Sequence, residues 1–488
     1  MKENIEEYFH IGEVGSVANK IPVNKELRAN IRKLILGIIL VIVLIVAMII
    51  IIFYKTSSNE ETYSKDDIKG EIKCEYNIEI TSSETRILGN DFSKESKFDI
   101  EINGEIIKYS KNYKFPDLGL QKVKFLLYDD INMENMFKDV IDLSSIIMNS
   151  DTNLKIKFIN NAFEGCEKLT YFKISGFDLT EIKSMNKLFY KSGLESFNTD
   201  YLFTKNLIDI SYMFAETSLS KIDLSLLDTS KVSDMSYLFE NCYSLKEINI
   251  KELKTEKVKD MSHMFKGCEN LLSLGISSIN TTSLENMSYM FTDCTLLTSI
   301  DLSNFYTKYV KDMSYLFNNC NSLKKIIINN FDTNNVENMA NMFSSCSNLQ
   351  SLDITNFNTN NVKNMSSMFR YDKYLEQIDI SKFNTKNVLD ISYMFDGCMA
   401  LSKLDVFNFN TNNVINMKGL FLNCITIKNL NLQNFITSKV TDMSETFRGT
   451  TQLLNLDLSH FETNNVKNMS GMFGECSSLT ILNYQIIL

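Results

Sequence analysis

The sequence predicts an α/β solenoid: a right-handed coil of about 14 helix-turn-strand units, preceded by a small β cap and a single transmembrane helix. Three observations predict it. A phenylalanine recurs every 26 residues, or 25 at two steps, from Phe137 to Phe473. Within each unit the apolar spacing changes from helix-like to strand-like. A long uncharged run stands well before the first unit. Fixed-period repeats of this length are typical of solenoids, because one unit cannot bury its apolar edge alone.

Composition excludes several classes of protein. The chain has 488 residues, a net charge of −10, no tryptophan and three histidines. An acidic chain cannot neutralise phosphates, so nucleic acid is not an expected partner. So few histidines make a histidine-based hydrolase or a histidine-ligated metal enzyme improbable. His263 and His460 fall at different positions of the repeat and are expected at the surface.

The uncharged run is Leu34–Tyr54, which as a helix would be about 31 Å long and could cross an apolar bilayer core of about 30 Å. A buried core helix or a signal-peptide apolar region is the alternative, but signal regions are shorter and end at a cleavage site. Four basic residues lie between positions 25 and 33, whereas Lys55 follows alone. This bias predicts that residues 1–33 form a cytoplasmic tail. Residues 55–69 would then be a stalk, and the repeats extracellular or lumenal.

Residues 70–129 lack the repeat and predict a β-sandwich-like N-terminal cap. Short alternating stretches are separated by Asn103-Gly104 and Pro116-Asp117, which are turn sequences. The alternating stretches are Lys97–Ile102, Glu105–Tyr109 and Gln121–Tyr128. Solenoid ends need polar cover, and a cap here would shield the first coil.

Residues 130–488 are the predicted solenoid. In the unit that starts at Val310, apolar residues first follow the stripe of a short amphipathic helix. The members of this stripe are Val310, Met313, Phe317 and Cys320. Ile326 and Ile328 are then two residues apart, as on the inner face of a strand. Each unit therefore predicts one helix, one turn and one strand.

One segment carries a family resemblance. Met287 to Thr307 reads MSYMFTDCTLLTSIDLSNFYT, and this pattern resembles the BspA-like leucine-rich repeat family, also known for its mycoplasma-lipoprotein-associated 26-residue repeat. The resemblance covers roughly residues 130–488. It implies a leucine-rich-repeat-like solenoid in a surface protein, and some members bind host proteins or matrix. This chain departs from the family by having an uncleaved anchor in place of a lipoprotein signal.

Cysteines, methionines and phenylalanines each recur in register. Cys268, Cys294 and Cys320 are 26 residues apart, so neighbouring coils would bring their Cα atoms within disulfide range, about 5 Å. Parallel side chains in a ladder suit a disulfide poorly, and Asp372 and Thr450 replace cysteine in two coils. We expect buried thiols; disulfides and, less so, metal binding are the alternatives. The methionine and phenylalanine ladders are expected to pack inward, although a methionine-rich surface can also form a binding site.

The outward positions of the predicted strands form the candidate binding face. Asp353, Asp379 and Asp405 would stack on consecutive coils, where like charges repel unless solvated or bridged. They could hold a cation or dock a basic partner, or they could be ordinary solvated surface. The whole candidate face is Lys325, Asp353, Gln377, Asp379, Lys403, Asp405 and Phe407.

The sequence contains no nucleophile motif, phosphate-binding glycine loop or metal-ligand pair, so no catalytic, metal or cofactor residues are expected and the chain is not predicted to be an enzyme. We expect a membrane-anchored surface protein whose solenoid binds protein or glycan partners on other surfaces. The alternatives are a structural surface-coat protein, or a receptor-like protein whose short tail docks a cytoplasmic partner.

Overall fold

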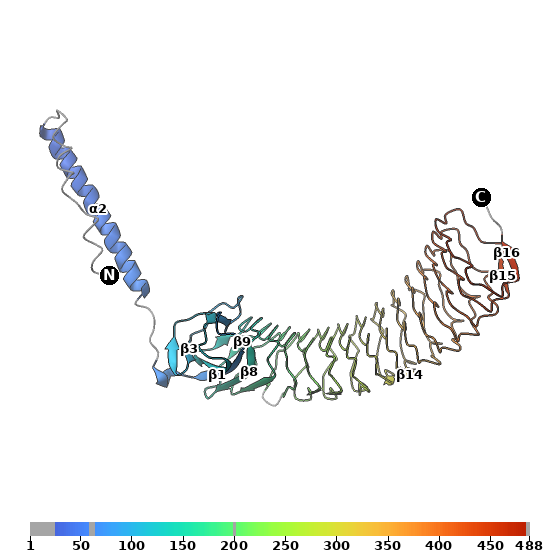
Figure 1. Cartoon of the computed structure of the whole chain (residues 1–488), viewed down its shortest axis with the longest axis horizontal. Coiled ribbons are helices and arrows are strands. Elements are labelled where there is room, and N and C mark those ends of the chain that lie inside the picture. Colours follow the sequence, from blue (N-terminus) through green and yellow to red (C-terminus); the bar gives the residue numbers. More distant parts are fainter. Residues whose placement is uncertain (1–24, 58–63, 199–201, 485–488) are drawn as a thin grey trace. The chain divides into compact units, whose positions relative to one another are not determined.

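The computed structural model describes residues 25–57, 64–198 and 202–484. The chain divides into two compact units, Met1–Asp67 and Ile68–Leu488, and each is considered by itself (Figure 1).

The first unit contains one long helix, α2, from Lys25 to Ser57, and a single 3-10 turn, Lys65–Asp67. Side chains of α2 are described for residues 33–49, and the large apolar ones are exposed, Leu34 by 65% and Leu40 by 64%. Among the residues described, no helix meets both the length and the hydropathy needed to cross a bilayer, so the predicted membrane helix is not confirmed. Most of the predicted tail, part of the stalk and the side chains at 50–54 lie outside the described residues.

The second unit begins with the strands expected between residues 70 and 129. These are β1 (Gly70–Ile78), β2 (Thr85–Arg86), β3 (Phe98–Ile102), β4 (Glu105–Ile107), β5 (Asn112–Tyr113) and β6 (Gly119–Leu127). The β3–β4 hairpin turns at Asn103 and Gly104, both with positive φ, as its Asn-Gly sequence predicts. The strands do not form a separate β-sandwich. Instead β1, β6, β3 and β4 extend the sheet of the first coils, β8 (Leu143–Ser150) and β10 (Tyr171–Ser175).

The coils follow in one row, and their strands are short and parallel (Figure 1). The paired strands are β7 (Ile131–Asn132) with β9 (Ile156–Phe158), β11 (Lys221–Asp223) with β12 (Glu247–Asn249), β13 (Ser299–Asp301) with β14 (Lys325–Ile327), and β15 (Asn455–Leu458) with β16 (Ile481–Tyr484). The repeated, stacked architecture predicted by the 26-residue period is confirmed.

The helix predicted in each unit is wrong: the described repeats contain turns at that place. In the coil at 310–335, Tyr315 and Asn319 have φ of 57° and 62°, which ends any helical run. The N–H groups of Asn318 and Cys320 close local turns three residues back. Those of Tyr315, Phe317 and Asn319 instead donate to carbonyls of the next coil, at 2.8–2.9 Å. Two successive four-residue turns bring apolar residues inward at intervals of 3 and 4, which imitates a helical stripe.

A second ladder runs along the edge of these turns. Single β-bridges join one position of every coil without interruption from Ser184 to Asn468. The position is Asp or Asn in all later coils, and its side chain caps the following turn, as Asp312 does by accepting the N–H of Ser314 at 2.8 Å. Bridges and turns together hold each coil in register with the next.

Buried threonines add a third connection between coils. The hydroxyl of Thr333 donates to the carbonyl oxygen of Asn358 at 2.9 Å and accepts the N–H of the same residue at 2.7 Å. Thr307, Thr359 and Thr385 repeat the arrangement with their own neighbours. Each hydroxyl thereby satisfies a backbone donor and a backbone acceptor that the adjacent coil cannot satisfy itself.

The phenylalanine ladder is the core of the solenoid, as predicted. From Phe137 to Phe473 each ring stacks on the next with centroids 5.3–6.0 Å apart. The methionines of the same turns, such as Met313 and Met339, are fully buried beside these rings.

Replacing an inner phenylalanine should therefore destabilise the protein more than replacing the last one. Phe317 is fully buried between Phe291 and Phe343, so Phe317→Ala should lower the free energy of unfolding by about 3–5 kcal/mol. Phe473 contacts a ring on one side only and is partly buried. Phe473→Ala should cost clearly less in the same denaturant titration. Equal losses would contradict a core held by stacking on both sides.

Candidate functional site

The cysteine register contains free, buried thiols, as predicted, and none of the ten cysteines is in a disulfide. The Cys294 thiol donates to the carbonyl oxygen of Phe265 at 3.2 Å, and Cys268 and Cys320 bond in the same way to Phe239 and Phe291. Burial raises the pKa of the Cys294 thiol well above its usual range. The register is therefore structural, since a protonated, buried thiol is a poor nucleophile.

Asp372 occupies this cysteine register and is fully buried. Its Oδ1 accepts the N–H of Cys346 at 2.8 Å, while Oδ2 has no hydrogen-bond partner. Burial raises the pKa of this carboxyl well above its usual range. Asp396, in the next coil, is also buried but pairs with Arg370 at 2.8 Å. Asp372 therefore destabilises the coil stack whenever it ionises.

His263 is not simply exposed, contrary to expectation. Its ring is stacked between Tyr237 and Tyr289, with centroids 4.2 and 4.5 Å away, in a row that continues to Tyr315. Burial lowers the pKa of His263 to about 4, so the imidazole is neutral at physiological pH. The sequence signal for this stack was present, since Tyr or His recurs at one position of these coils, but the predicted helix would have placed the position on an outer face.

The candidate binding face contains a real hollow. Between Ser351 and Asn429 this described stretch has one bridge on the strand side, Gln377 to Lys403, and no paired strands. A shallow groove of about 810 Å³ crosses the coils there. Its floor is apolar and nearly buried, formed by Leu352, Ile378 and Leu404.

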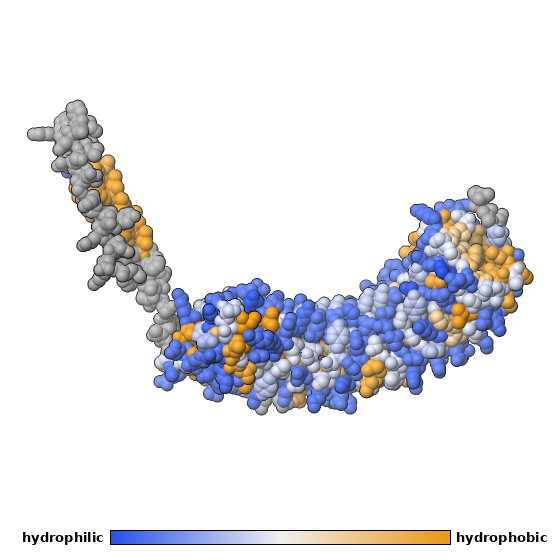
Figure 2. Space-filling view, in the orientation of Figure 1, coloured by the Kyte–Doolittle hydropathy of each residue, from blue (hydrophilic) through white to orange (hydrophobic). Residues whose placement is uncertain are grey.

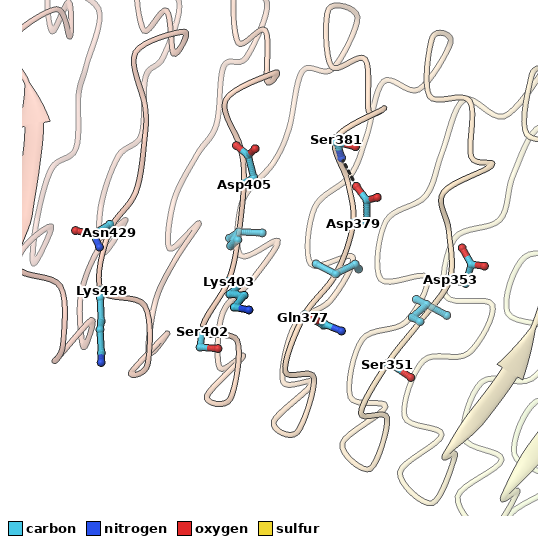
Figure 3. A pocket seen from close by; sticks show the side chains of 13 residues that line it. Ser351, Asp353, Gln377, Asp379, Ser381, Ser402, Lys403, Asp405, Lys428 and Asn429 are labelled. Atoms are coloured by element: carbon cyan, nitrogen blue, oxygen red, sulfur yellow. Dashed lines mark hydrogen bonds between the residues drawn. The ribbon is translucent and has the colours of Figure 1, made fainter.

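The two rims of the groove differ in charge. Asp353, Asp379 and Asp405 form a row along one rim (Figure 3). Amide, hydroxyl and amine groups lie along the other rim, which becomes basic toward the C-terminal coils. The members of this second rim are Ser351, Gln377, Ser402, Lys403, Lys428 and Asn429. An extended ligand lying in the groove would meet carboxylates on one side and donors on the other.

Each carboxylate of the acidic rim uses one oxygen locally. Asp353 Oδ1 accepts the hydroxyl of Thr355 at 2.8 Å, and Asp379 Oδ1 accepts the N–H of Ser381 at 3.0 Å. These hydrogen bonds from the hydroxyl and the N–H two residues ahead lower the pKa of both carboxyls, so they are ionised at neutral pH. Asp405 accepts the N–H of Phe407 at 2.9 Å. Local bonding and exposure explain how three like charges stand on successive coils.

Five of the seven residues predicted for the face line this groove: Asp353, Gln377, Asp379, Lys403 and Asp405. Lys325 lies outside it, in the paired strand β14, and Phe407 follows its coil's strand segment with 42% exposure. Sequence reasoning missed Lys428 and Asn429, which line its C-terminal end. In the described residues no group of three or more His, Cys, Asp or Glu side chains could hold a metal ion.

Sequence comparisons place this fold among known proteins. Residues 241–351, 324–426 and 399–485 match the profile "Mycoplasma protein of unknown function, DUF285", and together these matches cover just over half of the chain. Residues 73–195 and 158–290 match the profile "BspA type Leucine rich repeat region (6 copies)". No curated protein matches the sequence.

Solved structures of low similarity include three leucine-rich repeat or receptor proteins. A leucine-rich repeat protein from Eubacterium ventriosum is 15% identical, over 55% of this chain and 94% of its own, with a TM-score of 0.26. A leucine rich cell surface protein from Faecalibacterium prausnitzii is 16% identical, over 74% and 84%, with a TM-score of 0.25. The Drosophila Toll–Spatzle complex is 14% identical over 68% of this chain, with a TM-score of 0.25, and this chain spans 42% of the length of that one.

The coils and the profile matches define a leucine-rich-repeat solenoid protein. More narrowly, the chain belongs to the BspA-like leucine-rich repeat family. Repeat proteins of this kind are typically binding proteins rather than enzymes, and membership supports a role in protein interaction.

Restoring cysteine at position 372 should stabilise the protein. Asp372→Cys would replace a partly unsatisfied buried carboxyl by the thiol of neighbouring coils, for a gain of about 1–3 kcal/mol near neutral pH. Because the folded-state pKa is raised, the folded protein retains a proton that the unfolded chain loses above about pH 4. Wild-type stability is therefore lost as pH rises from there toward the folded-state pKa.

The measurement is urea unfolding of wild type and variant at about pH 4 and pH 8, since the unfolded carboxyl titrates near pH 4. The difference in unfolding free energy should widen at the higher pH. A difference that stays constant would mean that Asp372 does not titrate between the two states. Asp372→Asn, which cannot ionise, serves as the second variant.

Proposed function

We propose that this protein is a membrane-anchored surface protein whose solenoid binds a macromolecular partner through the groove between Ser351 and Asn429. The observation that carries the binding role is the groove itself: an apolar floor between an ionised acidic rim and a donor rim. Binding surfaces commonly combine an apolar centre with a polar rim that sets orientation. An extended protein or glycan chain bearing cationic groups fits this arrangement.

The proposed anchor is the helix α2. Its uncharged run, Leu34–Tyr54, and the exposed apolar side chains described in it support insertion into lipid, because isolated apolar helices are not stable in water. The basic residues before the run support a cytoplasmic N-terminus and outward-facing repeats.

Orientation can be tested with protease added to intact cells. We expect it to remove the repeats and to spare residues 1–33, and an epitope tag after Leu488 should be accessible without permeabilisation. A tag that antibodies reach only after permeabilisation would reverse the proposed orientation.

The groove can be tested by changing its acidic rim to asparagine. The triple change at Asp353, Asp379 and Asp405 should keep the fold, because an asparagine oxygen can still accept the local N–H, as Asn249 and Asn431 already do. Wild type and variant are compared on arrays of surface proteins and of glycans at low and high salt. Loss of three exposed charge contacts should weaken binding of a groove ligand by roughly tenfold at low salt, with a smaller difference at high salt.

The matched control is the pair Asp301→Asn and Asp457→Asn. These aspartates occupy the same position of their coils and cap Ser303 and Ser459 in the same way, but they do not line the groove. Binders lost in the triple variant and retained in the control would identify groove ligands. Equal binding by all three proteins at both salt concentrations would exclude the acidic rim as a docking site.

A further inference from the structure

The last described coil, 463–484, carries core residues without a neighbour to cover them. Met469 is 43% exposed, whereas Met443 at the same position of the preceding coil is fully buried. Ile481 and Tyr484 are 53% and 57% exposed, and Phe473 is only partly buried. Figure 2 shows hydrophobic residues gathered at this end of the solenoid. An apolar hollow of about 190 Å³ lies there, bordered by Leu458, Met469, Phe473 and other residues of the last two coils.

The backbone of this coil is also unpaired toward the end. In the preceding coil the N–H groups of Met443, Glu445, Phe447 and Gly449 all donate to carbonyls of the last coil, at 2.8–3.0 Å. The corresponding N–H groups, at 469, 471, 473 and 475, find no acceptor among the described residues. Strand β16 likewise pairs with β15 on one edge and with no described strand on the other.

The composition of this coil suits an interface rather than a solvated end. Terminal repeats of solenoids usually have a polar outer face. Here Lys467 and Glu475 are the charged residues of the coil, and their charges cancel. Interface centres are similarly depleted in charge. Gly471 and Gly474 stand beside Met472 and Phe473 and allow another backbone to come close.

A second copy of the chain is the occupant that these features fit. The other end of a copy cannot continue the stack, because strand β8 of its first coils is already paired on both edges, with β1 and β10. The same end of a second copy can approach across a two-fold axis. Antiparallel pairing then joins β16 to its own copy, because the same edge of an identical strand is complementary to itself. Each apolar face would cover the other.

We propose that two copies of this protein associate through their C-terminal coils, with the β16 edges paired antiparallel and Met469, Phe473 and Ile481 buried between them. The association does not depend on the groove or its ligand.

The experiment is sedimentation velocity of the full chain in detergent micelles over a dilution series. Wild type should form a dimer, with about twice the protein mass of the monomer at the higher concentrations. The double variant Met469→Glu, Ile481→Glu should remain monomeric, because both side chains are exposed in the single chain and two carboxylates would be buried in the dimer. Unchanged circular dichroism would show that the variant is folded.

Leu226→Glu is the matched control, since Leu226 is 61% exposed on a distant coil, and it should dimerise like wild type. A dimer that survives the double change would have to form elsewhere, for example through α2, and would overturn the proposal. A monomeric wild type would overturn it as well. Deleting residues 485–488 then identifies what covers the face: dimerisation only after the deletion would show that this segment does so.

Discussion

The structure depends on one constraint: a coil of about 26 residues cannot satisfy its own backbone. Alternate N–H groups of each turn segment therefore donate to the next coil, and left-handed residues such as Tyr315 and Asn319 aim them there. Because the bonds are repeated at every coil, they fix the register to the residue. Threonine hydroxyls such as that of Thr333 supply the pairs that the backbone leaves open.

Register fixed in this way places equivalent side chains directly above one another. Phenylalanine rings, thiols and methionines then become continuous columns, so that one substitution affects two neighbours. Asp372 shows what an unsuitable residue in a column does, since the adjacent coils offer only one backbone N–H to its two oxygens. The core consequently tolerates little variation, and differences between coils concentrate on the outside.

The strand side has the opposite character, because its pairing is intermittent. Where strands are paired, as in β13 and β14, the surface is closed. Between Ser351 and Asn429 pairing is reduced to one bridge, and the groove lies there. The turn ladder holds these coils in place, so the strand side can open without loss of the stack. A rigid spine with a variable face is the usual basis of recognition in repeat proteins. The ladder also has a direction, since N–H groups point toward the C-terminal end, and this leaves donors and core side chains uncovered at 463–484.

The sequence by itself determined the number and period of the coils, the inward columns of Phe, Met and Cys, the β3–β4 hairpin and five residues of the groove. Each of these depends on spacing along the chain, which stacking converts directly into position. Tertiary structure alone decided that the predicted helices are turns, because intervals of 3 and 4 are common to both and only the hydrogen bonds to the next coil distinguish them. It also decided that the cap continues the solenoid sheet, and that Lys428 and Asn429 complete the groove while Lys325 does not. Whether strands of successive coils pair or separate depends on the packing of whole coils, and no single repeat records it.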